Sequence, residues 1–223
     1  MVKKGWVLVL WLAVGWACGA PAHQAPADAP QEGVEVAMKK ENKPVAPCLE
    51  SLADYALPDG VDRSDPRWQA ERLVVVRKAK RRVVLYAKGK QLGCWPAGLG
   101  FEPEGHKTRE GDGRTPEGWY RTSDKPTSRY YQAIAVHYPN LGDAVRGLAD
   151  GRIDAATERA IRTALSADRK PPQATALGGE ILLHGGGSGS DWTLGCVAMN
   201  NDDIDALREQ LPDTMKVDVV VLP

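Results

Sequence analysis

The sequence has little net charge, little cysteine and no long apolar run. Its 29 lysines and arginines balance 29 aspartates and glutamates, so the 223-residue chain carries no formal net charge. A neutral chain has no long-range field to concentrate it on phosphate backbones, which disfavours general nucleic-acid binding. Four cysteines are too few for a disulfide scaffold at this length. No CxxC or HxxxH spacing occurs, so we expect neither a metal nor a cofactor.

What the chain does have is an ordinary hydrophobic fraction, 43%, together with 23 glycines and 16 prolines. That hydrophobic fraction argues against wholesale disorder, and the length allows one good core. The many glycines and prolines favour a body rich in turns and strands over a helical bundle. We therefore expect a folded part that is mainly β.

The N-terminus has the features of a secretion signal. Lys3 and Lys4 precede an uncharged, mostly apolar stretch of 13 residues, 5–17, which is shorter than the roughly 20 residues that a membrane span needs. Two processing sites are open: cleavage before Cys18, which sits in a loose lipobox and would be lipidated, or cleavage after Ala22. The sequence predicts a signal peptide at 1–17 and an extracytoplasmic protein of the periplasm or cell envelope, as a membrane-anchored lipoprotein or a cleaved soluble form.

A composition shift follows the signal. Residues 18–47 are rich in Ala, Pro, Gln, Glu and Lys with almost no large apolar side chains, which predicts a flexible tether. Such a tether would either let a folded domain reach away from a membrane or act only as a spacer. A lead-in segment is predicted at 48–71 and the folded domain at 72–223.

Strand patterns dominate the folded domain. β-branched runs at 73–76 and 82–86 flank basic residues 78–81, which predict an exposed hairpin turn, and a third strand follows at 91–100. Strands this close along the chain favour antiparallel pairing. Further strands are predicted at 119–120, 131–138, 180–184, 196–199 and 217–222, with a helical insertion at 143–169, whose N-cap is Asp154, and a short C-terminal helix at 201–211.

The chemistry is concentrated in residues 181–203. An apolar strand delivers His184 to its end, a glycine-rich loop follows, and Cys196 lies twelve residues after the histidine. A cysteine thiol becomes a good nucleophile when a neighbouring imidazole accepts its proton. Backbone N–H groups near Leu194, Gly195 and Cys196 are candidates for binding an oxyanion. The alternative is structural: His184 bonded to a loop carbonyl and Cys196 a small buried side chain.

Four ordered motifs resemble one known family. His184-Gly185 followed by Thr193-Leu194-Gly195-Cys196-Val197 is similar to the active-site signature of the L,D-transpeptidase catalytic domain, also called YkuD. Residues 111–118, GDGRTPEG, resemble its GDxRTPEG turn, Tyr138-Pro139-Asn140 its YPN, and Gly178-Gly179 its glycine pair. The resemblance covers about residues 73–211. It implies a mainly β fold, a YkuD-like β-sandwich with a helical insertion and a short C-terminal helix.

The resemblance also assigns roles. Cys196 becomes the nucleophile and His184 the base, with a backbone group near Gly185 or Gly186 orienting the imidazole. Two positions depart from the family pattern. Leu194 stands where many members have histidine, which leaves His184 as the base, and Ala198 stands where many have arginine, which removes a cation for a substrate carboxylate.

The activity implied by the resemblance is acyl transfer on peptidoglycan stem peptides, in cell-wall biogenesis and cell shape. Cys196 would displace the terminal D-alanine, and an amine of a second stem or of a wall-attached protein would accept the acyl group. Carbapenems are covalent inhibitors of the family. Three alternatives are kept: hydrolysis as an L,D-carboxypeptidase or endopeptidase, a non-catalytic wall-binding lipoprotein, and a metal-dependent hydrolase using His184, Cys196 and His137 or His106.

Other residues have two interpretations each. Thr193, Trp192, Arg114 and His137 are candidate substrate-binding residues. Thr193 would otherwise fix its own loop, Trp192 pack in the core, Arg114 brace its turn and His137 lie in the core or at the surface. His106 is expected to be solvated, and a disulfide between Cys48 and Cys94 is predicted for an oxidising compartment.

Overall fold

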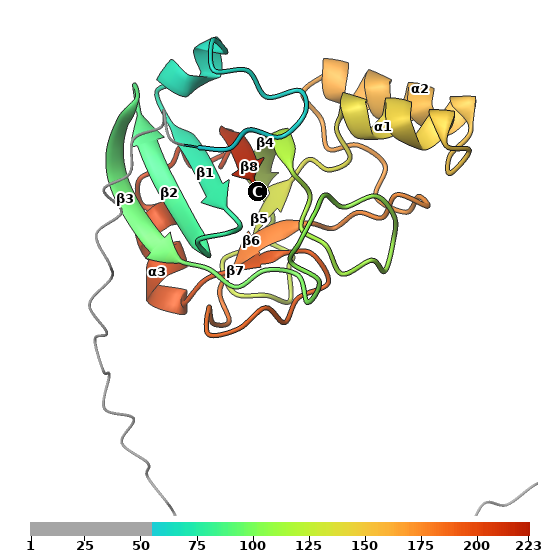
Figure 1. Cartoon of the computed structure of the whole chain (residues 1–223). Helices are drawn as coiled ribbons and strands as arrows, with labels where there is room; N and C mark the ends of the chain where they lie inside the picture. The colour runs from blue at the N-terminus through green and yellow to red at the C-terminus, as the bar shows by residue number, and fades with distance from the viewer. Residues whose placement is uncertain (1–54) are drawn as a thin grey trace, which may run out of the picture. The chain divides into compact units, whose positions relative to one another are not determined.

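The computed structural model describes residues 55–223 (Figure 1). They belong to the unit Lys43–Pro223, and residues 1–42 lie outside the described residues. The predicted signal peptide, tether, Cys18 and Cys48 also lie outside them. Between residues 55 and 223, no helix is both long and apolar enough to cross a membrane.

Eight strands form one mixed sheet in the order β3-β2-β1-β8-β4-β5-β6-β7 (Figure 1). The strands are β1 (Leu73–Arg77), β2 (Arg82–Ala87), β3 (Lys90–Pro96), β4 (Gly118–Asp124), β5 (Ile134–Val136), β6 (Leu182–His184), β7 (Val197–Ala198) and β8 (Asp218–Leu222). The first three pair antiparallel, as predicted. β1 with β8 and β6 with β7 pair in parallel, so the sheet as a whole is mixed.

The sheet curls until its two ends meet. The segment that follows β3 lies beside β7, the strand at the other edge of the sheet. There Gly98 and Ala198 of β7 exchange two backbone hydrogen bonds of 2.8 Å. Alternate side chains of β1 face two different cores, because successive residues of a strand point to opposite faces. Val74 and Val76 join the main core, whereas Leu73 and Val75 join a second one. The domain is therefore mainly β, as predicted, with a curled sheet and both faces covered.

The lead-in segment covers the second core. Tyr55, Val61 and Trp68 are buried there, and Trp68 belongs to the short 3₁₀ helix η2 (Pro66–Gln69). The Trp68 and Trp119 rings meet edge to face with centroids 5.1 Å apart. The described part of the lead-in is thus packed against the sheet.

The predicted helical insertion is two helices, α1 (Leu141–Ala149) and α2 (Ala155–Ser166), which lie side by side at the end of the domain opposite β3 (Figure 1). Gly151 separates them with φ +69°, a left-handed conformation that a continuous helix excludes. Asp154 is the N-cap of α2, as predicted, since its Oδ1 accepts a 2.7 Å bond from the Thr157 N–H. The C-terminal helix is α3 (Asn201–Arg208).

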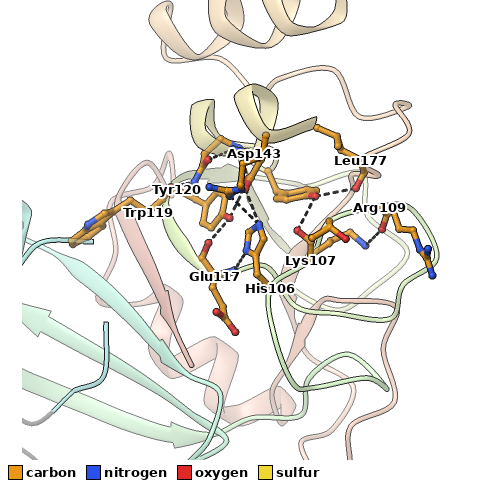
Figure 2. A network of polar contacts seen from close by, with 12 residues as sticks. His106, Lys107, Arg109, Glu117, Trp119, Tyr120, Asp143 and Leu177 are labelled. Carbon is orange, nitrogen blue, oxygen red and sulfur yellow. Dashed lines mark hydrogen bonds and ion pairs between the residues drawn. The ribbon is translucent and has the colours of Figure 1, made fainter. Parts of the chain in front are cut away.

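Asp143 joins α1 to the sheet through a buried polar network (Figure 2). Its carboxylate lies 3.2 Å from the Tyr120 hydroxyl and accepts bonds from Arg146 (2.6 Å) and the Asn140 N–H (2.8 Å). His106 Nε2 is 2.9 Å from Asp143 Oδ1, and its Nδ1 accepts the Glu117 N–H at 2.9 Å. The expectation that His106 is solvated is therefore wrong, because both ring nitrogens are bonded within this network.

The basic turn between β1 and β2 is also less exposed than predicted. Lys78 is only 2% exposed, and its Nζ donates to Glu117 (2.6 Å) and to the carbonyls of Gly105 and Thr115. Glu117 and Thr115 belong to the GDGRTPEG turn. Lys78 thus fastens that turn to the first hairpin.

Replacing Asp143 with alanine should lower the free energy of unfolding by about 2–4 kcal/mol, because the Asn140 N–H, the Arg146 guanidinium and His106 Nε2 all lose the buried carboxylate that they contact. Asp154→Ala removes only a cap and should cost about 1 kcal/mol. Urea unfolding followed by circular dichroism compares the two. Equal losses would show that Asp143 acts only as a helix cap.

Candidate active site

Two neighbouring parallel strands position His184 and Cys196. β6 and β7 pair with Leu183 opposite Val197 and His184 opposite Ala198. Cys196 directly precedes β7, so this register brings it opposite Leu182. Paired residues face the same side of a sheet and alternate along it, so Cys196 shares a face with Leu182 and His184. Both side chains line one cavity of about 510 Å³.

The His184 imidazole is buried and its tautomer is fixed. The ring is 1% exposed, and Nδ1 lies 2.6 Å from the Gly185 carbonyl oxygen. A carbonyl only accepts, so Nδ1 carries the proton and Nε2 keeps a free lone pair. The Tyr130 ring stacks on the imidazole at 4.4 Å and 24°, and Trp192 meets it edge-on at 5.7 Å. Burial lowers the pKa of His184, which keeps the ring neutral.

Cys196 carries a free thiol in the same cavity. Its Sγ donates to the backbone carbonyl of Glu180 at 3.5 Å. Burial raises the pKa of the thiol to about 11. The resting pair is therefore a neutral thiol and a neutral imidazole, and the thiol proton must be removed during any attack.

The turn before Cys196 is held by Thr193. The Thr193 hydroxyl donates to the Cys196 carbonyl at 2.7 Å and accepts the Gly195 N–H at 3.1 Å. Gly195 has φ +128°, and a Cβ there would lie 2.5 Å from the Arg114 carbonyl oxygen, so this position requires glycine. Thr193 thus fixes its own loop, although it also lines the cavity.

Two predicted oxyanion donors already have partners. The Gly195 N–H donates to Thr193, and the Gly185 N–H donates to the Tyr131 carbonyl at 2.8 Å. Leu194 lies at the cavity and is 72% exposed. Gly185 was a further candidate beside Leu194, Gly195 and Cys196, so the oxyanion hypothesis now rests on the N–H groups of Leu194 and Cys196.

The predicted substrate-binding residues divide into two groups. Trp192 lines the cavity with Thr193 and is 44% exposed, so it forms a wall of the cavity and is not a core tryptophan. Arg114 instead lines a second cavity of about 470 Å³, and its N–H donates to Asp112 at 3.1 Å. His137 is buried beside Ser123, with Nε2 2.9 Å from Oγ, and burial lowers its pKa to about 4. Neither Arg114 nor His137 lines the cavity of Cys196.

Sequence reasoning missed one stretch of the cavity wall. Lys125, Arg129 and Tyr130 line it, together with Glu180 beside the nucleophile. No motif marks these residues. The signal that comes closest is Tyr131, the first residue of the predicted strand 131–138, because its carbonyl receives the Gly185 N–H and so places this segment beside the His-Gly turn.

Two further predictions concern the other cysteines and a metal ion. Cys94 is disulfide-bonded, and its partner is not among residues 55–223. The predicted pairing with Cys48 lies outside the described residues. Within the described part of the chain, no group of three His, Cys, Asp or Glu side chains is arranged to hold a metal ion.

A curled β-domain that brings a free cysteine and a buried histidine into one cavity has the arrangement of a thiol enzyme. The family model of the L,D-transpeptidase catalytic domain, YkuD, matches residues 71–219. The chain belongs to this family, as its four motifs predicted.

Individual known proteins are similar to parts of the chain. YafK of Escherichia coli K12, provisionally named an L,D-transpeptidase, is 48% identical over 46 residues, 19% of each chain. The helical cell shape determining protein Pgp2 from Campylobacter jejuni is 26% identical with a TM-score of 0.46, covering 67% of this chain and 46% of Pgp2. Bd1075 of Bdellovibrio bacteriovorus is 20% identical with a TM-score of 0.43, covering 69% and 48%. The chain thus spans less than half the length of each.

Proposed function

We propose that this domain is a cysteine-dependent acyltransferase that acts on peptidoglycan stem peptides. Membership of the L,D-transpeptidase family supports an enzyme and this class of substrate. The observation that carries the proposal is the placement of Cys196 and His184 on one face of β6 and β7, lining one cavity, with Nδ1 of the histidine bonded to Gly185. This leaves Nε2 as the base for the thiol.

The first half-reaction forms a thioester. Cys196 Sγ attacks the carbonyl carbon that follows the L-centre of the diamino acid, and the thiol proton passes to His184 Nε2. The N–H groups of Leu194 and Cys196 donate to the oxyanion. When the C–N bond breaks, its electron pair goes to nitrogen, which takes the proton from His184 and leaves as D-alanine.

The second half-reaction releases the acyl group. An amine of another stem peptide, or of a wall-attached protein, attacks the thioester after losing a proton to His184, and Cys196 Sγ regains a proton as it departs. Water in place of the amine gives hydrolysis, the L,D-carboxypeptidase or endopeptidase outcome. The identity of the acceptor thus decides between transferase and hydrolase.

The setting proposed for this reaction is extracytoplasmic, because peptidoglycan lies there. It includes the signal peptide at 1–17 and lipidation at Cys18, which would attach the domain to a membrane. We also propose a role in cell-wall biogenesis and cell shape, for which the name of Pgp2 offers a parallel.

Incubation with a stem tetrapeptide and an amine acceptor tests the reaction. The wild-type protein should release D-alanine, and Cys196→Ala should release none. Mass spectrometry separates cross-linked from trimmed products, and EDTA should leave the rate unchanged. Binding of the peptide without D-alanine release would favour a non-catalytic wall-binding protein instead, and loss of activity in EDTA with recovery in zinc would favour a metal-dependent hydrolase.

A further inference from the structure

Arg129 is a cation of the cavity wall without a carboxylate partner. Other basic side chains near the cavity are ion-paired: Lys125 and Lys170 each lie 2.9 Å from the Glu180 carboxylate. Within residues 55–223, Arg129 has no ion pair, although it lines the cavity of Cys196. A guanidinium in this position is available to an anionic group of a ligand.

Aromatic contacts hold this guanidinium close to the candidate base. Arg129 Cζ lies 5.1 Å from the centroid of the Tyr130 ring, and its Nη2 donates to the Tyr130 hydroxyl at 3.1 Å. The same ring stacks on His184 at 4.4 Å. Guanidinium, phenol ring and imidazole therefore follow one another along the wall, and a cation over an aromatic face is attracted to it.

The turn that carries Arg129 is itself well bonded. The Lys125 N–H donates to the Ala133 carbonyl at 3.2 Å, the Ser128 N–H to the Lys125 carbonyl at 3.1 Å, and the Tyr130 N–H to the Ser128 hydroxyl at 3.0 Å. These bonds fix the backbone on both sides of Arg129. The side chain thus projects from a defined turn.

The charge of this wall favours an anion. The Lys125, Lys170 and Glu180 cluster has one positive charge in excess, and Arg129 adds a second. A guanidinium also presents its donors in a planar fork that matches a carboxylate. Ala198 provides no cation on the nucleophile's own strand. Arg129 is therefore a candidate partner for a substrate carboxylate in this cavity.

We propose that Arg129 binds the C-terminal carboxylate of the donor peptide, and that this contact makes the cavity select donors with a free C-terminus. The inference rests on the proposed function, because it names what the same cavity recognises. Arg129 is a specificity-determining residue in this scheme, and the chemistry stays with Cys196 and His184.

Binding to the inactive Cys196→Ala variant tests this directly. A stem tetrapeptide acid should bind about tenfold more tightly than its C-terminal amide, since the amide loses a charge-assisted contact. Adding Arg129→Gln should weaken binding of the acid about tenfold and leave binding of the amide unchanged. Arg129→Lys should keep part of the preference for the acid over the amide. Arg159→Gln is the matched control, because Arg159 is an exposed arginine of α2. Isothermal titration calorimetry measures all these affinities.

Two results would overturn the assignment of Arg129: equal binding of acid and amide, or equal loss of both in Arg129→Gln. The proposed function fails separately, if wild-type protein binds the acid preferentially and yet releases no D-alanine. Alkylation of Cys196 by iodoacetamide, a neutral reagent, should proceed at the same rate in the wild-type protein and in Arg129→Gln. A slower rate in Arg129→Gln would show that the arginine acts on the nucleophile and not on the carboxylate.

Discussion

Cys196→Ala is expected to abolish covalent capture by a carbapenem. Wild-type protein should gain the mass of one carbapenem, because the thiol opens the β-lactam ring and keeps the acyl group as a thioester. Cys196 is the only free cysteine among residues 55–223, and Cys94 is already disulfide-bonded. The variant should therefore show no adduct in intact-mass spectrometry.

Two controls make the Cys196→Ala result specific. Cys196 packs beside the small cluster of Ala133, Ala135 and Leu182, so loss of one sulfur should leave the fold intact, as a thermal melt would verify. Cys196→Ser keeps a donor for the Glu180 carbonyl but has a much weaker nucleophile, and should react far more slowly than wild type. An adduct that persists in Cys196→Ala would place the nucleophile elsewhere and contradict the proposed mechanism.

The placement of Cys196 and His184 in one cavity could be predicted from sequence because its signal is local. An apolar strand, a glycine-rich loop and a Gly-Cys turn lie within residues 181–203, and β6 and β7 form inside that window. The first hairpin was predictable for the same reason, since β1 and β2 are adjacent β-branched runs. The parallel pairing of β1 with β8 joins residues about 145 positions apart, and no local pattern specifies it.

Burial of polar side chains was the main thing that sequence could not predict. His106 and Lys78 occur among charged residues, yet the fold places them in polar networks with Asp143 and Glu117. The motif around Arg114 is equally consistent with a contact to substrate and with a braced turn. Only the tertiary structure shows that Arg114 lines a different cavity from that of Cys196. Arg129 and Tyr130 reach the cavity through pairing of β5 with β6, which a motif search does not see.

His184→Gln is expected to lower the rate of Cys196 acylation at pH 7 by about 10²–10⁴-fold, the range of a general base. A thiol with a pKa of about 11 is only about one part in ten thousand thiolate at pH 7. Without a base the reaction depends on that fraction, so the rate of the variant should rise about tenfold per pH unit toward pH 11. Stopped-flow acylation by a carbapenem across pH measures this slope.

The wild-type rate should instead be level around neutral pH. Burial lowers the pKa of His184 below its usual 6.5, because the charged imidazolium loses solvation. Protonation removes the lone pair of Nε2, so the rate should stay level through pH 6.5 and fall only at lower pH. Tyr130→Phe keeps the ring that stacks on His184 and should not change the pH below which the rate falls. Tyr130→Ala exposes the imidazole and should move that pH to a higher value. If His184→Gln were as fast as wild type at pH 7, the thiolate would form without the imidazole. The neutral pair inferred from the burial of Cys196 and His184 would then be wrong.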